Sequence, residues 1–141
     1  MRCAVVGAGA WGTALADLLA DNGHDVVIWA FEPDVAESIN GAHENRRFLT
    51  GYPLHPALRA TTRHADALEG AELVTYATPS HLLRSILRAG AAGVDAGAIL
   101  TVASKGIEQS TSALMTSVVD EETRREHDVV ALSGPSFAAE V

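Results

Sequence analysis

Basic residues are scarce in this chain, and lysine is almost absent. Lysine and arginine together number 10 against 18 aspartates and glutamates, which gives a formal net charge of −8. Nucleic acids and anionic membranes attract proteins through clustered lysine and arginine. We therefore expect no nucleic acid and no membrane surface among the partners. The single lysine, Lys105, is a candidate for a special role.

Cysteine is equally scarce. Cys3 is the only one, so no internal disulfide can form, and its place in RCAVVG predicts a buried strand residue. A reactive thiol at this position is the alternative. The 6 histidines are scattered without metal-ligand spacing, and no HExxH or CxxC motif occurs. We therefore predict no metal site.

Long apolar runs are missing as well. None approaches the roughly 18 residues of a membrane span, and no small-residue cleavage site follows the first apolar run. We expect a soluble protein of the cytoplasm. A length of 141 residues with 48% hydrophobic residues suits one packed domain.

Short, continuous apolar runs rich in β-branched residues recur along the chain. Runs of this kind are typical of strands buried on both faces of a parallel sheet. They cover residues 3–6, 26–29, 73–77, 98–102 and 129–132, with a shorter one at 58–61 inside the irregular segment 43–62.

Helix-like stretches separate these runs. In residues 11–24 the side chains of Leu15, Leu18 and Leu19 fall on one face before an Asn-Gly stop, and residues 80–90 repeat the pattern. Strands that alternate with helices predict right-handed βαβ units. The fold class we expect is α/β, a doubly wound parallel sheet of the Rossmann type, with ligand sites beyond the carboxyl ends of the strands.

A glycine-rich turn follows the first predicted strand. The segment VVGAGAWG places Gly7, Gly9 and Gly12 in GxGxxG spacing and opens the first helix. The first glycine permits the tight turn, the second lets the backbone approach a pyrophosphate, and the third lets helix and strand pack closely. The helix N-terminus offers N–H groups to the phosphates. The context predicts dinucleotide binding, and a turn without a ligand is the alternative.

The second predicted strand ends in WAFEPD. Glu32 lies at about the distance where an acid binds the ribose 2′-hydroxyl of NAD, and no Arg or Lys lies nearby for the 2′-phosphate of NADP. NAD is therefore the predicted cofactor, with NADP as the alternative. Phe31 either stacks on adenine or belongs to the core.

The fifth run leads into VASKGIE. A lysine at the carboxyl end of a central strand points into the crevice where a nicotinamide lies, and its ammonium can hold a phosphate, polarise a carbonyl or shuttle a proton. Lys105 is therefore the candidate catalytic residue. A solvated loop lysine is the alternative.

Two further loops follow predicted strands. Pro79 and Ser80 either form a turn with a helix cap or line the cofactor. In LSGPSFAAEV, Gly134 and Ser136 offer small residues, N–H groups and a hydroxyl that suit a phosphorylated substrate or the nicotinamide amide. A simple helix cap is again the alternative.

Taken in order, GAGAWGTALA, NRRFLTG, TPSHLLR, SKGIE and LSGPSFAAEV resemble the NAD(P)-dependent glycerol-3-phosphate dehydrogenase family over essentially the whole chain. The resemblance implies reversible reduction of dihydroxyacetone phosphate to sn-glycerol 3-phosphate, which supplies glycerolipid backbones. Its implied contacts fall into three groups: Ala10, Trp11, Phe31 and Ala138 with the dinucleotide, Lys105 with both cofactor and substrate, and Gly134 and Ser136 with the substrate.

The resemblance also implies a second, all-helical domain that carries a Lys-Asn pair with the proton acceptor. No such pair can exist in a chain whose only lysine is Lys105. We therefore interpret residues 1–141 as the dinucleotide-binding domain alone, with little or no turnover by itself. The rival interpretations are a dehydrogenase of this architecture for another hydroxy acid, and a non-catalytic dinucleotide-binding module. The oligomeric state stays open, with a homodimer of the longer protein as one option.

Overall fold

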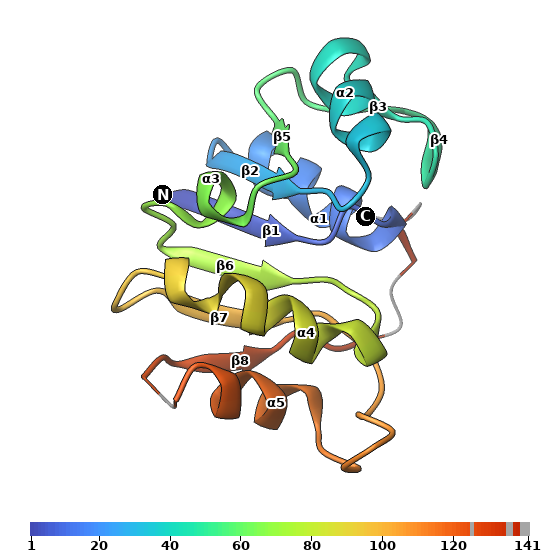
Figure 1. Ribbon diagram of the computed structural model, residues 1–141. Helices are drawn as coiled ribbons and strands as arrows, with labels where there is room; N and C mark the ends of the chain where they lie inside the picture. The colour runs from blue at the N-terminus through green and yellow to red at the C-terminus, as the bar shows by residue number, and fades with distance from the viewer. Residues whose placement is uncertain (125, 135–136, 139–141) are drawn as a thin grey trace.

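Six parallel strands form one sheet in the order β5-β2-β1-β6-β7-β8 (Figure 1). The computed structural model describes residues 1–124, 126–134 and 137–138. The strands of this sheet are β1 (Arg2–Val6), β2 (Asp25–Trp29), β5 (Arg59–Thr61), β6 (Leu73–Tyr76), β7 (Ile99–Val102) and β8 (Val129–Ala131). Each predicted strand agrees with the observed one to within one residue at either end. The order is that of a Rossmann sheet.

The central strand shows why the apolar runs are continuous. Cys3, Ala4, Val5 and Val6 of β1 are all fully buried. Cys3 and Val5 belong to the core on one face of the sheet, whereas Ala4 and Val6 belong to the core on the other. The predicted buried position of Cys3 is confirmed, and burial raises the pKa of its thiol.

Helices cover both faces of the sheet, so the predicted doubly wound arrangement is confirmed (Figure 1). Helices α1 (Ala10–Asp21) and α2 (Pro33–Ala42) pack on one face. Helices α3 (His64–Leu68), α4 (Ser80–Gly90) and α5 (Met115–Glu122) pack on the other, and the 3-10 turn η1 (Ala91–Gly93) follows α4. No helix of the described residues is long and apolar enough to cross a membrane.

The face by which α1 meets the sheet differs from the prediction. Leu15 is buried, but Leu18 is 41% exposed, and the core on this face takes Ala16 and Ala20 from the helix. Leu19 packs against this core and is partly buried. The fully buried contacts come from small side chains because α1 lies close to β1. The leucine pattern therefore misassigned part of the packed face.

The irregular segment 43–62 contains an antiparallel hairpin that the sequence analysis did not predict. Strands β3 (Glu44–Asn45) and β4 (Leu49–Pro53) pair with a register shift between Glu44 and Asn45. The hairpin lies beside α2 (Figure 1) and brings the chain back towards the glycine-rich turn through Asn45.

Candidate functional site

The sheet changes winding direction between β1 and β6. The chain leaves β1 for α1 on one face and leaves β6 for α4 on the other, which opens a crevice at the carboxyl ends of these strands. Two cavities of about 490 Å³ and 350 Å³ lie there. Both are lined by Gly9, Ala77, Thr78 and Pro79, so they adjoin and form one cleft. The loop with Pro79 lines the cleft in addition to preceding α4.

The three glycines differ in their surroundings as the motif predicts. Gly7 has a φ of +118°, and a Cβ there would lie 2.6 Å from the carbonyl oxygen of Ala77. A Cβ on Gly12 would lie 1.9 Å from the carbonyl oxygen of Gly7. A Cβ on Gly9 would meet nothing within 4 Å. The first and third glycines are therefore required by the fold, whereas the second leaves space for a ligand.

Helix α1 begins at Ala10 with its end open to this space. Gly9 is the N-cap residue and has no side chain to accept from the first turn. The first N–H groups of a helix have no acceptor within the helix, and the helix dipole makes this end positive. Gly9, Ala10 and Trp11 line the smaller cavity, so these donors suit an anion such as a pyrophosphate.

The larger cavity has apolar walls and an acidic rim. Its aromatic lining comes from Trp29, Phe31 and Phe48, and Glu32 lies beside them at the end of β2. Phe31 is 77% exposed, with its ring edge-on to Trp29 at 6.3 Å between centroids. The interpretation of Phe31 as a core residue is therefore wrong. A flat, exposed ring at this place suits stacking by a nucleobase.

Lys105 lines the smaller cavity, and its side chain is exposed. Its catalytic role stays a prediction, with a solvated loop lysine as the alternative. The Nζ of Lys105 is 5.8 Å from the centroid of the Trp11 ring and donates to the carbonyl oxygen of Gly134 at 3.4 Å. These contacts hold the ammonium beside the N-terminus of α1. Two segments that the sequence analysis singled out, around Lys105 and around Gly134, thus meet at one point.

Two polar atoms of the cleft lining have no protein partner. Thr78 Oγ1 and Trp11 Nε1 are buried and make no hydrogen bond within the described residues. Thr78 lines both cavities and Trp11 lines the smaller one. Buried polar groups are normally satisfied by protein, water or ligand. A small movement of either side chain would let its polar atom bind a molecule in the cleft.

The loop that carries Lys105 is fixed to α4 by an ion cluster. Arg84 donates to both carboxylate oxygens of Glu108, at 2.7 Å from Nε and 2.8 Å from Nη2, and also to Glu121 and Glu122. Hydrogen bonds from Arg84 lower the pKa of Glu108 to about 2. The same contacts raise the pKa of Arg84. Both groups therefore stay charged at neutral pH.

Two residues near Glu32 were not among the predicted site residues. Phe48 lines the larger cavity, and Arg47 places Nη2 4.0 Å from Glu32 Oε1. The statement that no Arg or Lys lies near Glu32 is therefore wrong in three dimensions. The hairpin brings Arg47 to the end of β2, and the only sequence signal for this contact is the NRRFLTG segment itself.

The remaining predicted positions lie near the end of the chain. Gly134 is exposed and accepts from Lys105, and Ala138 is half-buried. Ser136 lies outside the described residues. The roles of these residues stay predictions. Among the described residues, no group of three or more His, Cys, Asp or Glu side chains is arranged to hold a metal ion.

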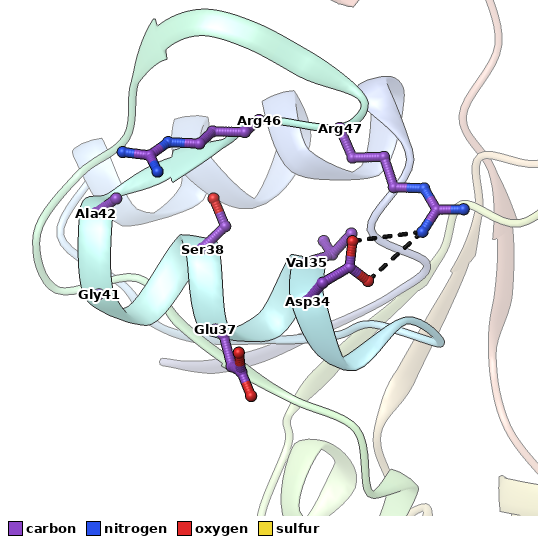
Figure 2. Close-up of a pocket in the computed structure, with 8 residues that line it drawn as sticks. All are labelled: Asp34, Val35, Glu37, Ser38, Gly41, Ala42, Arg46 and Arg47. Atoms are coloured by element: carbon purple, nitrogen blue, oxygen red, sulfur yellow. Dashed lines mark hydrogen bonds and ion pairs between the residues drawn. The ribbon is translucent and has the colours of Figure 1, made fainter.

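A further depression of about 540 Å³ runs along the outer side of α2 (Figure 2). It is lined by charged and small residues, among them Asp34, Glu37, Arg46 and Arg47. None of the three glycines lines it, so it lies apart from the cleft at the strand ends.

The strand order, the glycine turn and the open helix end define a domain of the Rossmann class, in which dinucleotides bind at the switch point. A family model described as the N-terminus of NAD-dependent glycerol-3-phosphate dehydrogenase matches residues 2–141. The chain belongs to this family, and the resemblance inferred from the motifs is confirmed.

Individual relatives agree with this assignment. The chain is 46% identical to glycerol-3-phosphate dehydrogenase [NAD(P)+] of Nitratidesulfovibrio vulgaris (strain DP4), covering 100% of this chain and 43% of the relative. Identity is also 46% to the protein of that name from Parvibaculum lavamentivorans, covering 99% and 41%. The crystal structure of glycerol-3-phosphate dehydrogenase from Coxiella burnetii superposes with a TM-score of 0.89 at 31% identity, covering 99% and 42%. The chain thus spans less than half of the length of these relatives.

Proposed function

We propose that this chain is the cofactor-binding half of an NAD(P)-dependent glycerol-3-phosphate dehydrogenase, and that its cleft binds NAD. The observation that carries the proposal is the glycine turn. Backbone atoms leave no room for a Cβ at Gly7 or Gly12, whereas the space beside Gly9 is free. That division of roles is what a pyrophosphate against the N-terminus of α1 requires.

The lining residues suggest the direction of the bound dinucleotide. The adenosine end lies in the larger, aromatic cavity, where Phe31 stacks on adenine and Glu32 accepts from the ribose 2′-hydroxyl. The nicotinamide end lies in the smaller cavity with Ala10, Trp11 and Lys105. Ala138 is proposed as a further cofactor contact on the strength of the family resemblance.

The proposed reaction is the reversible reduction of dihydroxyacetone phosphate to sn-glycerol 3-phosphate. When bound, the reduced nicotinamide would supply the hydride that C2 of the substrate needs, and a proton delivered to the C2 oxygen would complete the hydroxyl. Lys105 stabilises negative charge on that oxygen or holds the phosphate, and Gly134 and Ser136 complete the phosphate pocket. The proton donor lies in the helical domain that the family resemblance implies beyond residue 141.

An assay of the longer protein that contains this chain tests the substrate. With NADH present, dihydroxyacetone phosphate is expected to be turned over, and 2-oxo and 3-oxo acids are not. Turnover of an oxo acid alone would establish a dehydrogenase of this architecture for another substrate. Dinucleotide binding without turnover of any of them would establish a non-catalytic binding module.

Two further statements belong to the proposal. We place the enzyme in the cytoplasm, because its substrates are small phosphorylated metabolites and its charge gives no attraction to anionic membranes. A homodimer of the longer protein is the proposed assembly, and light scattering of that protein measures it.

A further inference from the structure

A cation that the glycine motif does not predict lies beside Glu32 of the larger cavity, although it lines the neighbouring depression along α2. Arg47 Nη1 lies 3.4 Å and 3.5 Å from the two carboxylate oxygens of Asp34, and Nη2 lies 4.0 Å from Glu32 Oε1 (Figure 2 shows the contact with Asp34). Asp34 and Glu32 flank the point where β2 passes into α2. The guanidinium therefore lies beside the acid that is proposed to bind the ribose 2′-hydroxyl.

The backbone next to Arg47 is fixed to the glycine turn. Asn45 is fully buried, and its Nδ2 donates to the carbonyl oxygen of Ala8 at 2.9 Å and to Thr13 Oγ1 at 2.8 Å. Its Oδ1 accepts from the backbone N–H of Phe48 at 3.0 Å. These bonds tie the β3–β4 hairpin to the start of α1. Arg47 thus extends from a segment that a buried network fixes beside the glycine turn, and not from a free loop.

The side chain itself is held only weakly. Arg47 is 52% exposed and Asp34 is 66% exposed, and ion pairs in water contribute little to stability. The guanidinium also lies over the Phe48 ring, with Cζ 5.3 Å from its centroid. Arg47 can therefore exchange its carboxylate partners for another anion at small cost. A phosphate monoester accepts two parallel hydrogen bonds from a guanidinium, which a lysine does not match.

We propose that Arg47 is a cofactor-specificity residue that binds the 2′-phosphate of NADP and thereby sets how strongly the cleft prefers NAD. The proposal rests on the proposed function, because it concerns the same dinucleotide site. Glu32 serves the 2′-hydroxyl of NAD, while Arg47 neutralises part of the charge that a 2′-phosphate brings next to Glu32 and Asp34. The two carboxylates still oppose the phosphate, so NAD remains the preferred cofactor, and Arg47 sets how large that preference is.

Arg46 provides a matched control. Figure 2 shows the two arginines extending from adjacent positions towards opposite ends of α2, Arg47 towards Asp34 and Arg46 towards Ala42. Arg46 is 68% exposed and pairs with Glu44 at 3.3 Å. It has the same charge as Arg47 but lies away from Glu32. Replacing either arginine by glutamine removes one positive charge. Only the replacement of Arg47 also removes the group that is proposed to bind the 2′-phosphate.

The test compares dissociation constants of NADH and NADPH for the wild-type protein, Arg47→Gln and Arg46→Gln by isothermal titration calorimetry. We expect Arg47→Gln to raise the ratio of the NADPH constant to the NADH constant by about tenfold, the loss of a charge-assisted hydrogen bond. Arg46→Gln should leave the ratio unchanged. The fragments 2′,5′-ADP and 5′-AMP should show the same difference, since they differ only in the 2′-phosphate.

The outcomes separate this inference from the function on which it rests. An unchanged ratio in Arg47→Gln, or an equal change in both variants, overturns the role of Arg47 and leaves dinucleotide binding intact. Binding of neither cofactor by the wild-type protein overturns the proposed function and the inference together. Thermal melting of each variant verifies that it is folded, as expected for exposed side chains.

Discussion

Alanine substitutions at Gly9 and Gly12 distinguish the glycine that leaves space for a ligand from the glycine that the fold requires. In Gly9→Ala the added methyl meets no protein atom within 4 Å, and φ at this position is −69°. Alanine is a poorer N-cap than glycine but restricts the unfolded chain more, so the two effects oppose. We expect the free energy of unfolding to change by less than about 0.5 kcal/mol. The methyl does occupy the space into which a pyrophosphate would come, so NADH affinity should fall at least about tenfold, or ~1.4 kcal/mol.

Gly12→Ala should have the opposite profile. Its methyl would lie 1.9 Å from the carbonyl oxygen of Gly7, well inside the 3.0 Å that real Cβ atoms keep. Because the obstacle is backbone, no rotamer change relieves it, and α1 must move away from β1. The cost lies at or above the upper end for overpacked sites, about 3 kcal/mol. Gly41→Ala is the control, since Gly41 lies in α2 with nothing within 4 Å. There we expect a gain of roughly 0.5–1 kcal/mol and unchanged NADH affinity.

Urea unfolding and NADH calorimetry on the three variants give both quantities. The reasoning is refuted if Gly9→Ala binds NADH as tightly as the wild type does, because Gly9 would then not face the pyrophosphate. It is equally refuted if Gly12→Ala is as stable as the wild type, because the close approach of α1 and β1 would then not depend on glycine.

Three further predictions concern other parts of the domain. Lys105→Ala should leave NADH affinity within about threefold of wild type but greatly lower turnover by the longer protein, which steady-state kinetics measures. A variant that turns over at the wild-type rate would show that Lys105 is a solvated loop lysine. Glu108→Gln should destabilise the domain at pH 7, because Arg84 loses a charged acceptor, and urea midpoints measure this. Arg84 lowers the pKa of Glu108 from 4.5 to about 2. The stability that the ionised Glu108 contributes is therefore complete above pH 4.5 and is lost as the pH falls towards 2. The difference in urea midpoint between wild type and Glu108→Gln should therefore become smaller as the pH falls. A difference that does not depend on pH would contradict the ion pair between Arg84 and Glu108. Tyr76→Phe should raise the free energy of unfolding by about 1 kcal/mol, because the buried Tyr76 hydroxyl has no hydrogen-bond partner within the described residues; a loss of stability in calorimetry would show that the hydroxyl is satisfied.

The strands and the glycine turn were predictable because their signals are local. A strand buried on both faces needs a continuous apolar run, and the run from Cys3 to Val6 is fully buried as expected. The turn needs Gly7 and Gly12 for steric reasons that depend on spacing within one βαβ unit. The placement of Lys105 in the lining of the cleft was predictable, because it lies in the loop that follows the central strand β7.

The contacts that escaped prediction join residues far apart in the sequence. Arg47 reaches Glu32 only because the β3–β4 hairpin folds back and Asn45 fixes it to Ala8, 37 residues away. Arg84 and Glu108 are separated by 24 positions, and neither carries a local sign of its partner. Such contacts depend on how elements pack, which the period of hydrophobic residues does not encode. The exposed Leu18 has the same cause, since close packing of α1 was not apparent from its leucines.

The two tryptophans of the chain offer the most direct measurement of the central claim, that a dinucleotide lies along the cleft. Trp29 lines the larger cavity and Trp11 the smaller one, and the sequence has 2 tryptophans in all. NADH is titrated into the protein while tryptophan is excited and the emission of the reduced nicotinamide is recorded. The account predicts a saturable energy-transfer signal that excess NAD displaces. A signal that stays absent, or that rises linearly and resists displacement by NAD, would contradict it.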